Sequence, residues 1–319
     1  MQSWFRMFNI FFLLWYVRGA VASPGFGIGS HVSTLDKHGS LDNGIHQTSG
    51  GLHSNTTKLL PRKKCNGAEI THRHVMYTVR RIHTAIMFSD PFPHLYIKNI
   101  FHPKVYACMI GAIPKTLRGY EPLMKKLPRY WMNLMDEKGS VERRLFSSGS
   151  LDFGSQFWNS FAKHFGSALL KKTYMNKFNL TVSLRSPEST KHVFWTMALS
   201  RDLPGIEVGP HTDVDNKLVT VLYYLPKDTQ VTRSLGTLML RSKNKRIQPQ
   251  GSKWESWKDP DFEVVKRADF VPNSVFAFAP CHSSWHAVPK FSGRHARDTI
   301  QAFINSPDRL NPRKAPCAP

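Results

Sequence analysis

The stretch RDLPGIEVGPHTDVDNKLVTVLYYL, from Arg201 to Leu225, decides how the rest of the chain is interpreted. It ends in a long run of strand-forming residues, and His211 and Asp213 stand two positions apart just before that run. In an extended segment, residues i and i+2 point to the same face. Two interpretations follow. The pair belongs to a polar turn that leads into a buried strand, or it is half of a metal site whose remaining ligand lies elsewhere.

Strand-forming segments dominate the chain from about residue 181 onward. The segment 217–226 is continuously apolar, as expected of a strand that is buried on both faces. Gly, Pro and Asn separate the segments, and we expect no helix between them. Further strands are expected at 192–201, 236–242, 270–280, 284–290 and 298–306. The pattern predicts a mainly β fold with supporting helices (α+β) and a jelly-roll core over 181–319.

The region before this core is expected to be helical support. Apolar residues recur at helical spacing over 72–88, and Pro103 is expected to open a second helix that runs to about Ile113. A short strand and turn at 92–101 and a helix around 154–172 complete the support region, 71–180. On position alone, 115–153 and the polar insertion 243–266 are candidate lids.

The first 70 residues are expected to lie outside the fold. Arg6, the apolar stretch from Met7 to Val17 and the small residues Ala20-Val21-Ala22 predict a cleaved signal peptide over 1–22. A type II membrane anchor or an organellar presequence is the alternative, although the stretch is shorter than the roughly 20 residues of a typical span. No later segment is apolar and long enough to span a membrane. Residues 23–70 are rich in Gly, Ser and His and predict a flexible linker.

A secretory route, to the ER lumen or outside the cell, predicts a glycoprotein with disulfides. Asn55 and Asn179 fit the acceptor pattern for N-glycosylation. Four cysteines allow up to two disulfides, in a pairing that the sequence leaves open: Cys65, Cys108, Cys281 and Cys317. Cys108 is interpreted as a buried free thiol on a helix.

A third metal ligand is offered by His286, at the edge of another expected strand. Two histidines and one carboxylate on one face of a metal are the ligand set of non-haem Fe(II) oxygenases, and the other face stays open. His282, four residues earlier, is the alternative to His286. His211, Asp213 and His286 are therefore the candidate metal ligands.

A 2-oxo acid bound on the open face of the metal would bring a distal carboxylate that needs a cation. Arg297 opens the next expected strand, and Thr299 follows on the same face. A guanidinium binds a carboxylate bidentately, and a hydroxyl adds a further hydrogen bond. Arg294 is the alternative cation, and ordinary strand packing is the alternative role of Thr299. Tyr223 and Tyr224 could also reach the acid, with at least one of them in the core.

Together these residues resemble the 2-oxoglutarate/Fe(II)-dependent oxygenase superfamily, in particular its prolyl-4-hydroxylase-like branch. The resemblance covers roughly 90–306 and is carried by DPFPHLYIKNIFHPKVYACMIGAIP, RDLPGIEVGPHTD, GTLML and SWHAVPKFSGRHARDTI. It implies a double-stranded β-helix and hydroxylation by O₂ coupled to decarboxylation of 2-oxoglutarate to succinate and CO₂. Fe(II), 2-oxoglutarate as co-substrate and ascorbate as an accessory reductant are the cofactors it implies. The substrate stays open: polypeptide, glycan or small molecule.

The net charge of +22 suggests a second kind of function. The basic residues occur in short scattered clusters, without a zinc-finger spacing or an RNA-binding aromatic signature, so nucleic acid is not expected as a partner. The alternative hypothesis is a secreted, non-catalytic β-sandwich module that binds an acidic polymer through its basic surface.

We interpret Arg201 and Asp202 as a structural pair.

Overall fold

The computed structural model describes residues 65–123, 127–136, 153–185, 192–214, 216–226, 233–244, 246–247, 258–307 and 316–318. The expected signal peptide, the acceptor Asn55 and almost all of the expected linker lie outside these residues. Residues 137–152 of the candidate lid 115–153 also lie outside them. The described residues belong to one unit, Leu59–Pro319. Within this part of the chain, no helix combines the length and apolar character needed to cross a membrane.

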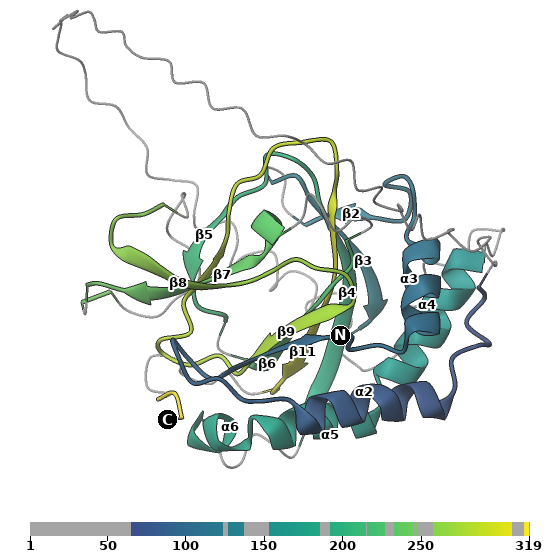
Figure 1. The fold of residues 1–319 in the computed structure, drawn as a ribbon, viewed down its shortest axis with the longest axis horizontal. Helices are drawn as coiled ribbons and strands as arrows, with labels where there is room; N and C mark the ends of the chain where they lie inside the picture. The colour runs from purple at the N-terminus through teal and green to yellow at the C-terminus, as the bar shows by residue number, and fades with distance from the viewer. Residues whose placement is uncertain are drawn as a thin grey trace, which may run out of the picture. The chain divides into compact units, whose positions relative to one another are not determined.

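Two antiparallel sheets form the core, which confirms the predicted jelly-roll fold class (Figure 1). The seven-stranded sheet has the order β1 (His94–Lys98), β9 (Ser274–Phe278), β6 (Lys217–Tyr224), β11 (Arg297–Asn305), β4 (Phe194–Asp202), β3 (Arg129–Met135), β2 (Glu121–Pro122). The four-stranded sheet has the order β5 (Val208–His211), β10 (His286–Val288), β7 (Thr237–Ser242), β8 (Phe262–Ala268). The sequence-predicted strands thus pair in two layers, with the HTD segment at an edge of the smaller sheet.

The helices lie along one face of the larger sheet (Figure 1). They are α2 (His72–Thr84), α3 (Pro103–Ala112), α4 (Phe153–Phe165), α5 (Ala168–Lys177) and α6 (Asn179–Arg185), with a 3₁₀ turn η2 at Arg233–Leu235. Pro103 begins α3 as predicted, and the ring of His102 accepts a hydrogen bond from the Lys104 amide. These local signals agree with the sequence because Pro is well placed in a first helical turn, where its missing N–H is not needed.

The single helix predicted around 154–172 is interrupted at Gly166. A Cβ on Gly166 would lie 2.6 Å from the Ala162 carbonyl oxygen, a backbone atom, so the close approach of the end of α4 requires glycine there. Ser167 then caps α5, and its hydroxyl accepts a hydrogen bond from the Leu170 amide. The chain turns at this point because a glycine and a good N-cap residue stand together.

Alternating side chains give the larger sheet two different faces. On one face, Leu199, Tyr223 and Ile300 belong to a core that includes the aromatic residues of α4. On the other, Leu222 and Tyr224 pack in a second cluster with Met239 of the smaller sheet. Period-two alternation explains this division, and it places every second residue of β4, β6 and β11 in the space between the sheets.

Three strands lie in segments for which the sequence predicted other roles. β2 and β3 fall within 115–153, and β8 begins within the expected insertion 243–266 and extends two residues beyond it. β3 pairs with β4, and β8 pairs with β7. β8 has the sequence FEVVKRA, whose charged residues are typical of an exposed sheet edge. Because the segment is not an apolar run, its sequence did not indicate a strand.

The four cysteines form two disulfides, Cys65–Cys108 and Cys281–Cys317. The first joins the segment before α2 to α3, and the second joins residues 316–318 to the turn that precedes β10. The interpretation of Cys108 as a free thiol was wrong. Its helix was predicted correctly, but its partner lies in a segment that the sequence assigned to a linker, so nothing in the local pattern indicated a bond.

The packing of α4 gives a test of the core. Phe161 is fully buried and its ring packs against those of Phe101 and Phe165. Replacing Phe161 by Ala should lower the free energy of unfolding by about 3–5 kcal/mol, because the lost transfer energy is joined by the cost of a cavity. Urea unfolding followed by circular dichroism measures the change.

Leu180 on α6, whose side chain is 68% exposed, is the matched control. Its replacement by Ala should change the free energy of unfolding by less than about 0.5 kcal/mol. Equal losses in the two variants would show that α4 does not pack on the sheet as described.

Candidate functional site

His211, Asp213 and His286 come together between the two sheets at the edge of the smaller one. β5 ends at His211 and β10 begins at His286, and these two residues are direct partners in the β5–β10 pairing. Asp213 follows two residues after the end of β5. One potential ligand atom from each residue lies within 4.8 Å of the others, and the two imidazole rings have centroids 4.1 Å apart. The structure therefore joins residues from separate parts of the chain as the sequence predicted.

Each histidine is oriented by a carbonyl two residues earlier in the chain. Nδ1 of His211 is 2.9 Å from the Gly209 carbonyl oxygen, and Nδ1 of His286 is 3.0 Å from that of Ser284. A carbonyl only accepts, so each Nδ1 carries the proton and donates it. Nε2 of each ring is left with its lone pair, which is the state in which an imidazole binds a metal.

Asp213 is held by two donors from β6. Nζ of Lys217 lies 2.7 Å from Oδ1, and the hydroxyl of Thr220 donates to Oδ2 at 2.5 Å. Burial alone would raise the pKa of Asp213, but the Lys217 ammonium, which also donates a hydrogen bond to it, holds this pKa well below its usual range. The carboxylate is therefore ionised at neutral pH. The Lys217 ammonium also lies 3.7 Å above the ring of Phe303.

The imidazoles are neutral for a physical reason. Burial within the fold, together with the nearby His286, lowers the pKa of His211 to about 3. Burial also lowers the pKa of His286, against the opposing effect of Asp213. Two neutral imidazoles and one carboxylate make a donor set with a charge of −1, which suits a divalent cation of the first transition row.

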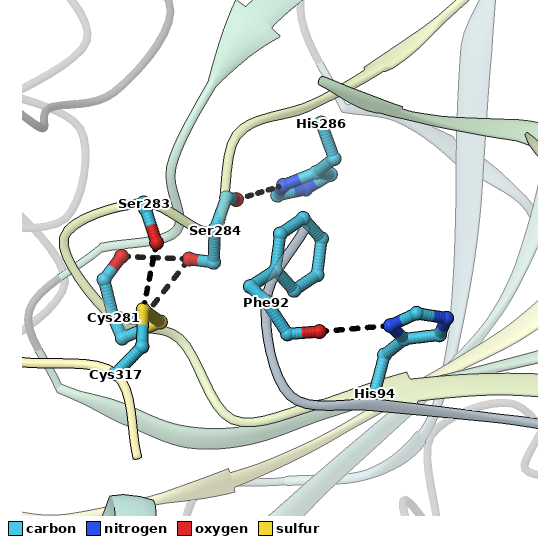
Figure 2. Close-up of a disulfide and its surroundings, with 7 residues drawn as sticks. All are labelled: Phe92, His94, Cys281, Ser283, Ser284, His286 and Cys317. Carbon is cyan, nitrogen blue, oxygen red and sulfur yellow. Dashed lines mark hydrogen bonds between the residues drawn. A yellow bond between two sulfur atoms is a disulfide. The ribbon is translucent and has the colours of Figure 1, made fainter. Parts of the chain in front are cut away.

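The turn before His286 is covalently and non-covalently braced (Figure 2). The Ser284 hydroxyl donates to the Cys281 carbonyl oxygen at 2.8 Å and accepts from the Cys281 amide at 3.0 Å. Cys281 is bonded to Cys317. The ring of Phe278 packs edge-on against that of His286, with centroids 4.8 Å apart. The carbonyl that orients His286 thus belongs to a turn whose conformation is restrained by a disulfide and by hydrogen bonds.

Arg297, the predicted cation, is buried at the other end of β6, with only 1% of its surface exposed. Its Nε donates to the Leu235 carbonyl oxygen at 2.8 Å, one terminal nitrogen bonds Asp202 at 2.8 Å, and the other is 3.4 Å from Oγ1 of Thr237. The rings of Tyr224 and Phe270 lie 5.7 and 5.3 Å from its central carbon. A planar cation held this tightly is positioned before any ligand arrives.

The charges around Arg297 do not balance. Asp202 is fully buried and also binds Arg129 through two hydrogen bonds of 2.6 and 2.9 Å. Burial would raise the pKa of Asp202, but Arg129 and then Arg297 reverse that effect and lower the pKa. Two guanidiniums thus share one carboxylate, which leaves one positive charge without a partner in this group.

Thr299 provides the second observation that fits an anion here. Its side chain is fully buried, and Oγ1 has no hydrogen-bond partner among the described residues. Most buried hydroxyls in proteins are hydrogen-bonded. An unsatisfied donor close to an unbalanced guanidinium fits a carboxylate group.

The alternatives weighed from the sequence lie outside the site. His282 and Arg294 are both exposed on turns. Tyr223 faces the helices, where the Tyr174 hydroxyl donates to its own, whereas Tyr224 faces the inter-sheet space and bonds Thr237. Tyr223 is thus a core residue, as predicted for at least one member of the pair.

The expected pairing of Arg201 with Asp202 was wrong. Neighbours on a strand point to opposite faces. Arg201 binds Asp298 on the helix side of the sheet with hydrogen bonds of 2.7 and 3.1 Å, and Asp202 binds Arg129 and Arg297 on the other side.

Sequence reasoning also missed Lys217, Thr220 and Thr237, which contact the site residues. Thr220 and Tyr224 are four residues apart on β6 and share a face, so period-two spacing could have identified Thr220. Apart from its position four residues after Asp213, nothing in the sequence indicated that Lys217 would contact the site. The same face of β6 therefore carries Thr220 beside Asp213 and Tyr224 beside Arg297, so the two halves of the site face one inter-sheet space.

No family model and no curated protein matches this chain. Among solved structures, a Pseudomonas putida prolyl-4-hydroxylase aligns at 12% identity with a TM-score of 0.39, covering 72% of this chain and 98% of that one. A Trichoplax adhaerens prolyl hydroxylase in complex with a hypoxia-inducible-factor peptide aligns at 12% identity and TM-score 0.42, covering 76% and 96%. HygX of Streptomyces hygroscopicus, with nickel, 2-oxoglutarate and hygromycin B bound, aligns at 9% and 0.40, covering 75% and 88%.

The lowered pKa of His211 predicts how the metal-free protein responds to acid. In the unfolded chain His211 takes up a proton near pH 6.5, but in the folded protein only near pH 3. Its contribution to stability is therefore complete above pH 6.5 and is lost as the pH falls from 6.5 towards 3. Replacing His211 by Asn should make the decline in the free energy of unfolding between pH 6.5 and 4 shallower, as measured by urea unfolding.

The exposed His282 supplies the comparison. A His282→Asn variant should keep the wild-type slope over the same range. A slope unchanged by His211→Asn would mean that the His211 ring is already protonated in the folded protein.

Proposed function

We propose that this protein is an Fe(II)- and 2-oxoglutarate-dependent dioxygenase that hydroxylates a substrate with decarboxylation of 2-oxoglutarate to succinate and CO₂. The observation that carries the proposal is the convergence of His211, Asp213 and His286 on one point. The ligand types fit a ferrous ion because the set supplies two neutral nitrogens and one anionic oxygen and leaves positions for other ligands.

The ion would be held by Nε2 of both histidines and by a carboxylate oxygen of Asp213. When bound, iron would supply the redox chemistry that activates O₂ for insertion of one oxygen atom into a C–H bond. The protein's own contribution is orientation. The carbonyls of Gly209 and Ser284 fix the two rings, and Lys217 and Thr220 fix the carboxylate before the ion binds.

The co-substrate half of the proposal rests on Arg297, with Thr299 as a second donor. The unsatisfied hydroxyl lies on β11, and the uncompensated positive charge is shared by the two guanidiniums that bind Asp202, one of them on β11. Both features face the space between the sheets. The distal carboxylate of 2-oxoglutarate would neutralise the charge and accept the hydroxyl's hydrogen bond. The other end of the acid would then extend along β6 towards the metal ligands.

We also propose that the protein works in an oxidising compartment of the secretory pathway. Two disulfides support this, because structural disulfides persist in such compartments and are rare in the cytosol. The apolar segment at 7–17 and the acceptor Asn179 are consistent with the same route. Ascorbate is the reductant that we propose for keeping the iron ferrous.

Replacing Asp213 by Ala tests the metal half. The variant loses the only carboxylate of the donor set and leaves the Lys217 ammonium beside the ion. Without oxygen, the weak visible charge-transfer band of Fe(II) with a chelated 2-oxo acid should form in the wild-type protein and be absent from the variant. Decarboxylation of 2-oxoglutarate should fall at least about a hundredfold, a loss on the scale of removing an electrostatic group from a reaction centre.

Glu263→Ala serves as the control, since it removes an exposed carboxylate from β8. This variant should retain the band and the activity. Absence of the band from folded, iron-loaded wild-type protein would overturn the proposal in favour of the polyanion-binding module.

Replacing Thr299 by Val tests the co-substrate half without changing the shape of the side chain. Removal of an unsatisfied buried hydroxyl should leave the stability of the ligand-free protein unchanged or slightly higher. The affinity for 2-oxoglutarate should fall by about tenfold or more, since a hydrogen bond to a charged group contributes roughly 1.5–3 kcal/mol. Anaerobic titration with Mn(II) in place of iron measures the affinity. A normal affinity with lower stability would instead assign Thr299 to strand packing.

A further inference from the structure

Thr299 is one of three unsatisfied donors in a row across the larger sheet. Among the described residues, the Trp131 indole nitrogen and the Ser200 hydroxyl are also buried without a hydrogen-bond partner. Trp131 is the direct cross-strand partner of Ser200, and Ser200 is the direct partner of Thr299. Cross-strand partners point to the same face. The three donors therefore lie side by side on β3, β4 and β11, facing the space between the sheets.

A row of buried donors without hydrogen-bond partners is unusual, because such groups destabilise the folded protein and apolar residues could take their place. Buried polar groups in native proteins are nearly all hydrogen-bonded, and alanine or valine at these positions would avoid the penalty altogether. Ser200 and Thr299 are fully buried, so water at the surface does not satisfy them. Unsatisfied groups of this kind point to a partner that binds from outside the chain.

The charge next to the row defines that partner. Two residues along the same strands, Arg129, Asp202 and Arg297 form a second row, in which Asp202 is the direct partner of both arginines. This second row carries one unbalanced positive charge. An anion with several acceptor atoms satisfies both rows together, whereas an uncharged ligand would leave the charge unbalanced.

We propose that Ser200 and Trp131 are co-substrate-binding residues that act with Thr299 and Arg297 on the bound dicarboxylate. This inference rests on the proposed function and extends its binding site from β11 to β4 and β3. An ionised carboxylate offers about four lone-pair positions. Arg297, Thr299, Ser200 and Trp131 supply four donors, of which the indole N–H is a donor only.

The Trp131 ring lies on the side of the row that is nearer to the candidate metal ligands. Its centroid lies 6.4 Å from that of Phe303, whose other neighbour is the Lys217 ammonium that binds Asp213. The indole therefore reaches from the row towards the metal ligands. Ser200 lies between Thr299 and Trp131, and it stands two residues from Asp202 on β4 as Thr299 stands two residues from Arg297 on β11.

Two variants test the proposal: Ser200→Ala and Trp131→Phe, which keeps an aromatic ring but removes the N–H. The affinity for 2-oxoglutarate is measured by anaerobic calorimetry on the full chain loaded with Mn(II). We expect a loss of at least about tenfold for Ser200→Ala and about threefold or more for Trp131→Phe. The affinity for pyruvate, which lacks the distal carboxylate, should stay within twofold of wild type in both variants.

A second titration uses glutarate and metal-free protein, so it does not depend on iron chemistry. If the wild-type protein fails to bind metal but binds glutarate in a manner sensitive to Ser200, the proposed function fails and the anion site stands. If 2-oxoglutarate and glutarate bind Ser200→Ala and Trp131→Phe as tightly as wild type, or if neither acid binds the wild-type protein, the inference is overturned.

Ser274→Ala is the matched control. Ser274 is also fully buried on the larger sheet, but its hydroxyl donates to the Val271 carbonyl oxygen at 2.7 Å. Its loss should lower the melting temperature of the ligand-free protein and leave acid binding unchanged. Ser200→Ala should do the reverse, keeping or raising the melting temperature while weakening binding. A lowered melting temperature with normal binding would assign Ser200 to the fold alone.

Discussion

A single buried carboxylate, Asp202, fixes the geometry of the larger sheet and the charge of the candidate site. It binds Arg129 and Arg297 from the strands on either side and is fully buried. Breaking a buried ion pair by removing one partner is strongly destabilising, because it leaves an uncompensated charge in a dry interior. Removal of Arg129, Asp202 or Arg297 would therefore destabilise the fold. The surplus positive charge of these three residues persists until an anion binds, so one arrangement holds three strands in register and prepares a place for a ligand.

The smaller sheet makes the complementary contribution. Its edge strand β5 pairs directly with β10 through His211 and His286, so backbone hydrogen bonding sets the distance between the two rings. Asp213 comes from the segment that leaves β5, and β6 of the larger sheet supplies the donors that hold it. The candidate metal ligands thus come from the smaller sheet, and the larger sheet supplies the donors that hold the carboxylate. A slip between the layers would separate Asp213 from Lys217 and Thr220.

The sequence allowed the fold class and the metal-ligand group to be predicted because each left a local signal. Apolar runs marked the central strands, and the spacing of His211 and Asp213 required only that the backbone be extended. The errors came from features that depend on distant residues. β8 is charged because it lies at an edge, the bond of Cys108 depends on a residue far along the chain, and Asp202 finds its partners only when β3 and β11 are placed beside it. Ser200 and Trp131 gave no signal at all, since a missing hydrogen bond can be seen only in a folded structure.

The disulfide beside the candidate metal centre has a practical consequence for anyone who handles the protein. The Cys281–Cys317 bond braces the turn whose carbonyl orients His286, one of the candidate metal ligands (Figure 2). Thiol reagents, often added to keep iron ferrous, attack disulfides through a thiolate and would release this turn. Ascorbate reduces iron without that exchange. The choice of reductant therefore determines whether the turn that orients His286 keeps its disulfide in the purified protein.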